Sequence, residues 1–151
     1  MSNFASTDSD TYTVKFTATA DGATTINVAA NGYTDANSNN NTASAEFNWT
    51  QDDTAPAPTM TAVDADGNAV ADGATTNDAY LVLTIETGEA TTNFAVGDIT
   101  VTGGSLSNFA STDSDTYTVR FTPTADGATT ISVAANGYTD GAGNNNTASE
   151  E

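Results

Sequence analysis

Residues 115–140 read DTYTVRFTPTADGATTISVAANGYTD, and this stretch decides the fold. Tyr117, Val119 and Phe121 alternate with polar residues, which is the period of two that a half-buried β-strand requires. The Asp126-Gly127 pair that follows predicts a turn, because glycine adopts positive φ without steric cost. Alternation resumes at Ile131, Val133 and Ala135, so a second half-buried strand is expected after the turn.

The same pattern recurs along the rest of the chain. Tyr12, Val14 and Phe16 repeat the alternation, and Asp-Gly pairs separate most of the predicted strands. Further strands are expected at residues 26–30, 45–49, 59–63, 80–86, 94–96 and 99–101. Because about seven short strands in roughly 105 residues are typical of a two-sheet arrangement, we predict an all-β, antiparallel β-sandwich.

The sequence contains one long internal repeat. The segment from Ser2 to Glu46 returns from Ser107 to Glu151, and 38 of the 45 aligned positions are identical. A period of this length is the size of a small domain rather than of a solenoid repeat. We therefore expect residues 1–50 to be the rear half of one repeat, so that the natural N-terminus lies upstream. Residues 51–151 are expected to be a second repeat that lacks its last strand, the counterpart of 47–50.

Charge and composition exclude several classes of function. The chain carries 20 acidic residues against only Lys15 and Arg120, a formal net charge of -18, and it has no His and no Cys. A Ser-His-Asp triad, a thiol nucleophile and the usual zinc sites are therefore excluded, so we expect no enzyme. The acidic surface disfavours nucleic acid, and no apolar run is long enough for membrane insertion. The same charge favours divalent cations with oxygen ligands, above all calcium.

Four motifs in order resemble a known family. They are DDTAPAP from Asp52, DITVTGG from Asp98, FTPTADG from Phe121 and TDGAGN from Thr139. Together they resemble the bacterial immunoglobulin-like tandem repeats of giant surface adhesins. The resemblance implies an immunoglobulin-like antiparallel β-sandwich in tandem repeats, and a non-catalytic extender of an extracellular protein at the cell surface. The first copy departs from the last motif at residues 36–38, where both glycines are absent.

Acidic and amide side chains at the repeat junction are candidate calcium ligands. They precede the Pro-containing linker or lie in the loop before the junction, and the second copy has the corresponding loop. These residues are Asp35, Asn37, Asn39, Asp52 and Asp53, with Asp140 and Asn144 in the second copy. Carboxylate and amide oxygens are ligands that Ca²⁺ accepts in flexible geometry, so they could surround a calcium ion at the joint.

A purely structural interpretation of these residues stays open. Asp and Asn hydrogen-bond their own backbone in turns, and Pro56 stiffens a linker without any ion. The segment from Asp64 to Asn68 also resembles a calcium loop superficially. Its glycine comes too early for an EF-hand and no Glu follows at the bidentate position, so we expect a hairpin or bulge turn there.

Four aromatic residues have predicted structural roles. Phe47 and Trp49 are two residues apart and share one face of a strand, so we expect them to close the sandwich core. The alternative for Trp49 is an exposed platform for carbohydrate. Tyr33 and Tyr138 precede a Thr-Asp loop, where a buried ring with a hydrogen-bonded hydroxyl would fix the turn.

Two classes of function follow. The first is a calcium-stiffened stalk that projects a binding domain or links cells in a biofilm, and the alternative is an adhesive module that binds carbohydrate or protein. A half-repeat has too little core to fold alone, and the second repeat presents an open edge. We therefore expect neighbouring copies of the same repeat as partners, strand-swapped so that residues 45–50 of one chain complement another.

Overall fold

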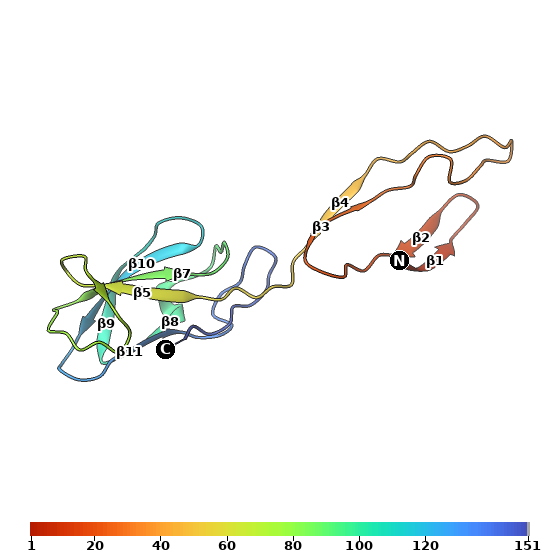
Figure 1. The fold of residues 1–151 in the computed structure, drawn as a ribbon. Coiled ribbons are helices and arrows are strands. Elements are labelled where there is room, and N and C mark those ends of the chain that lie inside the picture. Colours follow the sequence, from red (N-terminus) through yellow and green to blue (C-terminus); the bar gives the residue numbers. More distant parts are fainter. Residues whose placement is uncertain (151) are drawn as a thin grey trace. The chain divides into compact units, whose positions relative to one another are not determined.

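The computed structural model describes residues 1–150 and divides into two compact units (Figure 1). The first unit spans Met1–Asp53 and the second begins at Thr54. The described residues form antiparallel sheets and one 3-10 turn, η1 (Val96–Asp98), but no α-helix. No helix within this part of the chain is long and apolar enough to cross a membrane. The predicted all-β fold is therefore confirmed.

The second unit contains two antiparallel sheets. The larger sheet has the strand order β6-β5-β7-β10-β9, and the smaller one pairs β11 with β8. The strands are β5 (Thr59–Val63), β6 (Ala69–Val70), β7 (Leu81–Glu86), β8 (Ile99–Thr102), β9 (Gly104–Ser111), β10 (Thr116–Pro123) and β11 (Thr130–Val133). The central pair, β7 and β10, is in register from Leu81 opposite Phe121 to Glu86 opposite Thr116.

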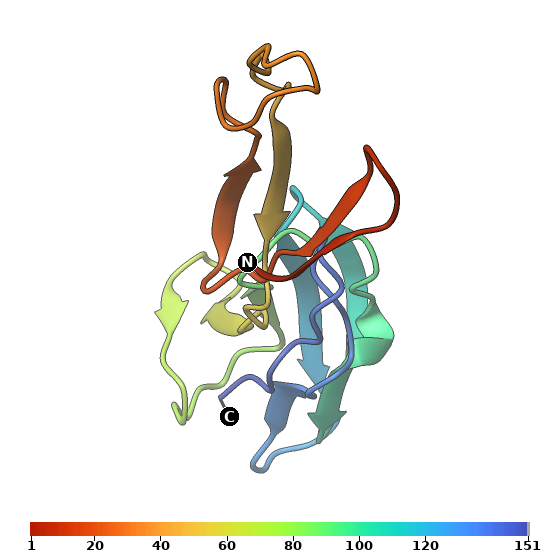
Figure 2. The ribbon, with the colours of Figure 1, turned by 90° about the vertical axis from the view of Figure 1, so that its right-hand side faces the viewer.

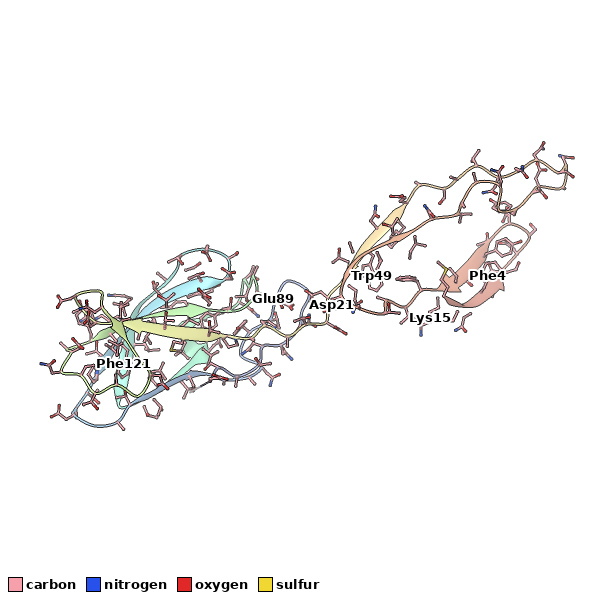
Figure 3. All side chains as sticks on the ribbon, viewed as in Figure 1. Phe4, Lys15, Asp21, Trp49, Glu89 and Phe121 are labelled. Atoms are coloured by element: carbon pink, nitrogen blue, oxygen red, sulfur yellow. The ribbon has the colours of Figure 1, made fainter. Side chains whose placement is uncertain are left out.

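The core of the second unit lies between these sheets. Alternate residues of β10 are buried, including Val119 and Phe121, as the sequence pattern predicts. They pack in one cluster with Ile85 of β7 and with Ile99 and Val133 of the smaller sheet. Figure 3 shows Phe121 among the side chains of this unit. Because full burial of each such side chain stabilises by about 1.5–3 kcal/mol, this cluster carries the fold.

Tyr138 fixes the turn that follows β11. It is only 1% exposed, and its hydroxyl donates a 2.6 Å hydrogen bond to the carbonyl oxygen of Thr87. Burial raises the pKa of Tyr138 to about 12, so the hydroxyl keeps its proton at neutral pH. The predicted role is confirmed for Tyr138 but is wrong for Tyr33, which is 64% exposed. The first unit has no counterpart of β7, the strand that leads to Thr87.

The first unit consists of two separate strand pairs, visible as open ribbons in Figure 1 and, after a quarter turn, in Figure 2. They are β1 (Ser2–Ser6) with β2 (Tyr12–Lys15), and β3 (Gly22–Ile26) with β4 (Phe47–Gln51). Phe47 and Trp49 are 65% and 39% exposed, so the expectation that they close a core is wrong in this unit. The Trp49 ring packs edge-on against Phe16, at a centroid distance of 5.9 Å.

Three strand predictions need correction. Residues 94–96 do not form a strand, because the carboxylate of Asp98 accepts the Ala95 N–H at 2.8 Å and the chain turns into η1. The strand predicted at 26–30 ends at Ile26. Strand β9 escaped prediction because Leu106 and Phe109, which both pack on the core, are three residues apart. A register shift in the β9–β10 pairing and a positive φ at Asn108 explain this irregular spacing.

Candidate metal centre

Asp140 organises the loop after Tyr138. Its Oδ1 accepts backbone hydrogen bonds from Ala142, Gly143 and Asn144 at 2.8, 2.7 and 2.8 Å. Its Oδ2 accepts the Asn144 side-chain amide at 2.9 Å. The Asp140 side chain is thus held in one orientation, and Oδ2 is the less crowded of its two oxygens.

The same Asp-x-x-x-Asn loop occurs at two other places. Asp35 accepts the backbone and side-chain amides of Asn39, and Asp64 accepts those of Asn68, all at 2.8–2.9 Å. The expected turn at residues 64–68 is confirmed, because it joins β5 to β6. Ser38 takes the place of Gly143 and still adopts a positive φ of 66°, so the first copy keeps the loop without the glycines.

Hydrogen bonding keeps the Asp140 carboxylate ionised. Burial on its own raises the pKa of Asp140, but the hydrogen bonds from Asn144, Gly143 and Ala142 outweigh it and hold the pKa below the ordinary value of 3.8. The unfolded chain binds the proton more readily than the folded chain. This loop therefore stabilises the fold at neutral pH, and its contribution is lost as the pH falls through the folded-state pKa.

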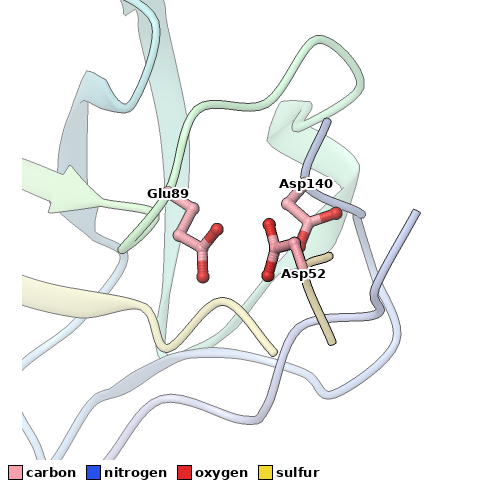
Figure 4. Close-up of side chains that lie close together, drawn as sticks. All are labelled: Asp52, Glu89 and Asp140. Atoms are coloured by element: carbon pink, nitrogen blue, oxygen red, sulfur yellow. The ribbon is translucent and has the colours of Figure 1, made fainter. Parts of the chain in front are cut away.

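Glu89 comes from the turn that ends β7. The Thr87 N–H donates to the carbonyl of Asp115 at 2.8 Å, and its hydroxyl donates to the carbonyl of Glu89 at 2.8 Å. Gly88 between them has φ of 85°, and a Cβ there would lie 2.7 Å from the Ala57 carbonyl oxygen. One carboxylate oxygen of Glu89 lies within 4.8 Å of one of Asp140, and both side chains are drawn in Figure 4.

Glu89 and Asp140 are therefore two carboxylates of the second unit that could hold a metal ion. Both donors are carboxylate oxygens, which suits hard cations such as Ca²⁺ or Mg²⁺ rather than thiophilic metals. Asp52, the ligand predicted just before the linker, belongs to the first unit.

Asn146 fixes the end of the second unit where the linker joins. Its Oδ1 accepts the Gly137 and Tyr138 N–H groups at 2.8 and 2.9 Å, and its amide donates to the carbonyl of Ala134 at 2.9 Å. The next residue, Thr147, donates its N–H to the carbonyl oxygen of Pro56 at 2.9 Å. The start of the second unit is thereby tied to the segment that follows the Asp140 loop.

The structure separates the other predicted ligands from the linker. Ile26 pairs with Phe47 and Gly22 with Gln51, so the loop containing Asp35, Asn37 and Asn39 lies at the opposite end of the β3–β4 ladder from Asp52 and Asp53. Asp53 instead donates its N–H to Asp21 at 2.9 Å. A side-chain hydrogen bond with Asp21, reinforced by its negative charge, raises the pKa of Asp53.

Sequence reasoning missed Glu89. It lies in a front half that occurs only once in the chain, so the internal repeat offers no second copy to compare. The sequence signal for Glu89 as a ligand was weak. It is an acidic residue directly after Thr87-Gly88, where β7 ends near the Asp140 loop.

The comparisons agree with this architecture. Residues 52–151 match the family described as bacterial Ig-like domain. The chain belongs to this family. Searches of the curated proteins and of the solved structures gave no significant match. Bacterial Ig-like domains are typical of bacterial surface proteins and are usually non-catalytic, and no enzyme family matched this chain.

In this bacterial Ig-like domain, the matched region begins at Asp52, one of the predicted calcium ligands. The family therefore accounts for the fold of the second unit and for the linker that precedes it. Residues 2–46 repeat the sequence of residues 107–151 of this domain, with 38 of 45 positions identical.

Proposed function

We propose that this chain is part of a non-catalytic extender of a bacterial cell-surface adhesin, stiffened by calcium where one domain joins the next. The observation that carries the proposal is the pairing of Glu89 with Asp140 within 4.8 Å at one end of a bacterial Ig-like domain. Two carboxylates at this distance repel each other unless a cation lies between them.

The stiffening follows from which parts of the chain the ligands come from. Glu89 and Asp140 belong to the second unit, whereas Asp52 lies at the end of the first. We propose that Asp52 completes the ligand set, so that a bound ion restricts bending at the joint. Near-identity of the two copies supports a spacer, because a spacer depends on the number of repeats rather than on differences between them.

A calorimetric calcium titration tests the proposal. We expect one saturable site in the wild-type chain and a melting temperature that rises with calcium, because a ligand that binds only the folded state stabilises it. Glu89→Gln and Asp140→Asn should each weaken calcium binding by at least about tenfold. Glu86→Gln removes the same charge from the exposed end of β7 and should leave the affinity unchanged.

Equal calcium affinity in the wild-type chain, Glu89→Gln and Glu86→Gln would contradict a calcium site at Glu89. Such a result would assign any uptake to the general acidity of the chain. Asp35→Asn gives a second comparison, since Asp35 accepts the backbone and side-chain amides of Asn39 as Asp140 accepts those of Asn144, but the first unit has no counterpart of Glu89.

The partners that we propose are neighbouring copies of the same repeat, joined by exchange of a strand between chains. The exposed hydrophobic residues of the first unit support this part of the proposal, because Tyr12, Val14 and Val28 correspond to the buried Tyr117, Val119 and Val133. Side chains that are core in one copy are therefore uncovered in the other.

A further inference from the structure

A small pocket lies on the outer face of the larger sheet of the second unit. Thr118 and Arg120 alternate along β10 with the buried Val119 and Phe121, so their side chains lie on the face turned away from the core. Arg120 pairs with Val82 of β7. The pocket has a volume of about 300 Å³. Its lining includes Tyr80, Val82, Asn108, Thr118 and Arg120.

A bulge in β9 brings Asn108 to this pocket. Two residues of β9, Asn108 and Phe109, lie opposite the single residue Val119 of β10. Phe109 packs against the core, whereas Asn108, at a φ of 54°, lines the pocket. The bulge therefore places a polar amide beside Arg120 without removing an apolar side chain from the core.

Packing, rather than an ion pair, holds the guanidinium of Arg120. Its central carbon lies 3.6 Å from the centre of the Tyr80 ring, which is a cation–π contact. The Nε atom is buried and has no hydrogen-bond partner within residues 1–150, and no carboxylate of this range pairs with the group. The chain has 20 acidic residues and only two basic ones, yet the positive charge of Arg120 is left available for a partner from outside.

We infer that this Arg120 pocket binds a carboxylated sugar, that is, one uronic acid unit of an otherwise neutral glycan. The planar guanidinium offers parallel N–H donors that match the two oxygens of a carboxylate. The hydroxyl of Thr118 and the amide of Asn108 can donate to and accept from ring hydroxyls. The volume is at the lower end of the roughly 300–1,000 Å³ of ligand pockets, which suits a single sugar ring.

The net charge of the chain favours a sugar over other carriers of carboxylates. A formal net charge of -18 repels polyanions, among them acidic peptide segments and a second copy of this chain. A ligand with one carboxylate among neutral hydroxyls meets the least repulsion and keeps the full attraction to Arg120. The inference goes beyond the proposed stalk, because it gives the domain a binding site of its own.

The internal repeat supplies a matched control for the Arg120 pocket. Lys15 is the counterpart of Arg120, so the only two basic residues of the chain occupy the same position in the two copies. Within the first unit β2 pairs only with β1, so Lys15 has no counterpart of β7 beside it and is exposed. The complete pocket is therefore a feature of the second unit.

A nuclear magnetic resonance titration of the full chain tests the pocket. With methyl β-glucuronide as the probe, we expect saturable shifts of the backbone amides of Asn108, Thr118 and Arg120. Methyl β-glucoside, which has a hydroxymethyl group in place of the carboxylate, should bind at least about tenfold more weakly. The titration is made with chelator present, so that calcium cannot bridge the glucuronide to acidic side chains.

Two variants assign the binding to Arg120. Arg120→Gln should weaken glucuronide binding at least about tenfold, whereas Lys15→Gln, which removes the same charge from the first unit, should leave it unchanged. Equal affinity of the wild-type chain for glucuronide and glucoside would overturn the role of the carboxylate, and this comparison does not depend on any variant being folded.

Two further probes test the sugar itself. Acetate, or the capped peptide Gly-Asp-Gly, binding as tightly as the glucuronide would overturn a sugar site, in favour of a general anion site or of a protein partner. Glu89→Gln should bind the glucuronide like the wild-type chain. Failure of the calcium site and failure of the Arg120 pocket are therefore separate results.

Discussion

Replacing Phe121 by alanine is expected to lower the free energy of unfolding of the second unit by about 3–5 kcal/mol. Phe121 is 2% exposed in β10 and packs in the core cluster between the sheets. Its removal leaves a cavity in the cluster that also contains Leu83 and Ile85, in a domain whose core is small. Of the chain, 22 residues are Val, Ile, Leu or Phe, so few other side chains can compensate. Urea unfolding followed by circular dichroism measures the effect.

The internal repeat supplies the matched control for this variant. Phe16 is the counterpart of Phe121 at an offset of 105 residues, but its ring contact is with Trp49 in the open first unit. Phe16→Ala should leave the midpoint of the main unfolding transition unchanged. An equal loss of unfolding free energy in Phe16→Ala and Phe121→Ala would contradict the assignment of the stable core to the second unit.

Replacing Gly88 by alanine is expected to destabilise the second unit by roughly 2–5 kcal/mol, for two reasons that add. Gly88 has φ of 85°, in the left-handed region that L-residues adopt at a cost. An added Cβ would also lie 2.7 and 2.8 Å from the backbone oxygen and nitrogen of Ala57, which cannot move as a side-chain tip can. The melting temperature without calcium measures the loss of stability. A smaller rise of the melting temperature with calcium measures the displacement of Glu89.

Gly73→Ala separates the two causes. Gly73 also has positive φ, 71°, but nothing lies within 4 Å of a Cβ built there. Only the cost of placing an alanine at positive φ remains, and it lowers the free energy of unfolding by about 1–2 kcal/mol. Similar losses for Gly73→Ala and Gly88→Ala would show that the close approach of residue 57 does not constrain the turn that carries Glu89.

The sequence pattern predicted the regular strands well because burial and alternation coincide in them. Tyr117, Val119 and Phe121 in β10 are two apart and all buried, and β5 matches its predicted bounds, Thr59–Val63. The pattern failed where the backbone departs from a plain pleat. At β9 the register shift at Asn108 breaks the period of two, and before β8 the Asp98 carboxylate turns the chain.

The sequence pattern predicted only part of the candidate metal site. The TDGAGN motif drew attention to Asp140, and the acidic residues before the linker drew attention to Asp52. Glu89 depends on a contact between residues 51 positions apart in sequence, Glu89 and Asp140, which no local pattern encodes. The exposure of Phe47 likewise depends on the absence of covering strands from the first unit.

Small-angle X-ray scattering of the chain, at a concentration where it is monomeric, tests the central proposal most directly. With calcium in excess, the account predicts the scattering of a rod with a fixed joint between its two units, and with chelator the scattering of two units that move freely about the linker. Glu89→Gln should give the chelator curve under both conditions, whereas Glu86→Gln should behave like the wild-type chain. Identical wild-type curves with calcium and with chelator would contradict calcium stiffening of the joint.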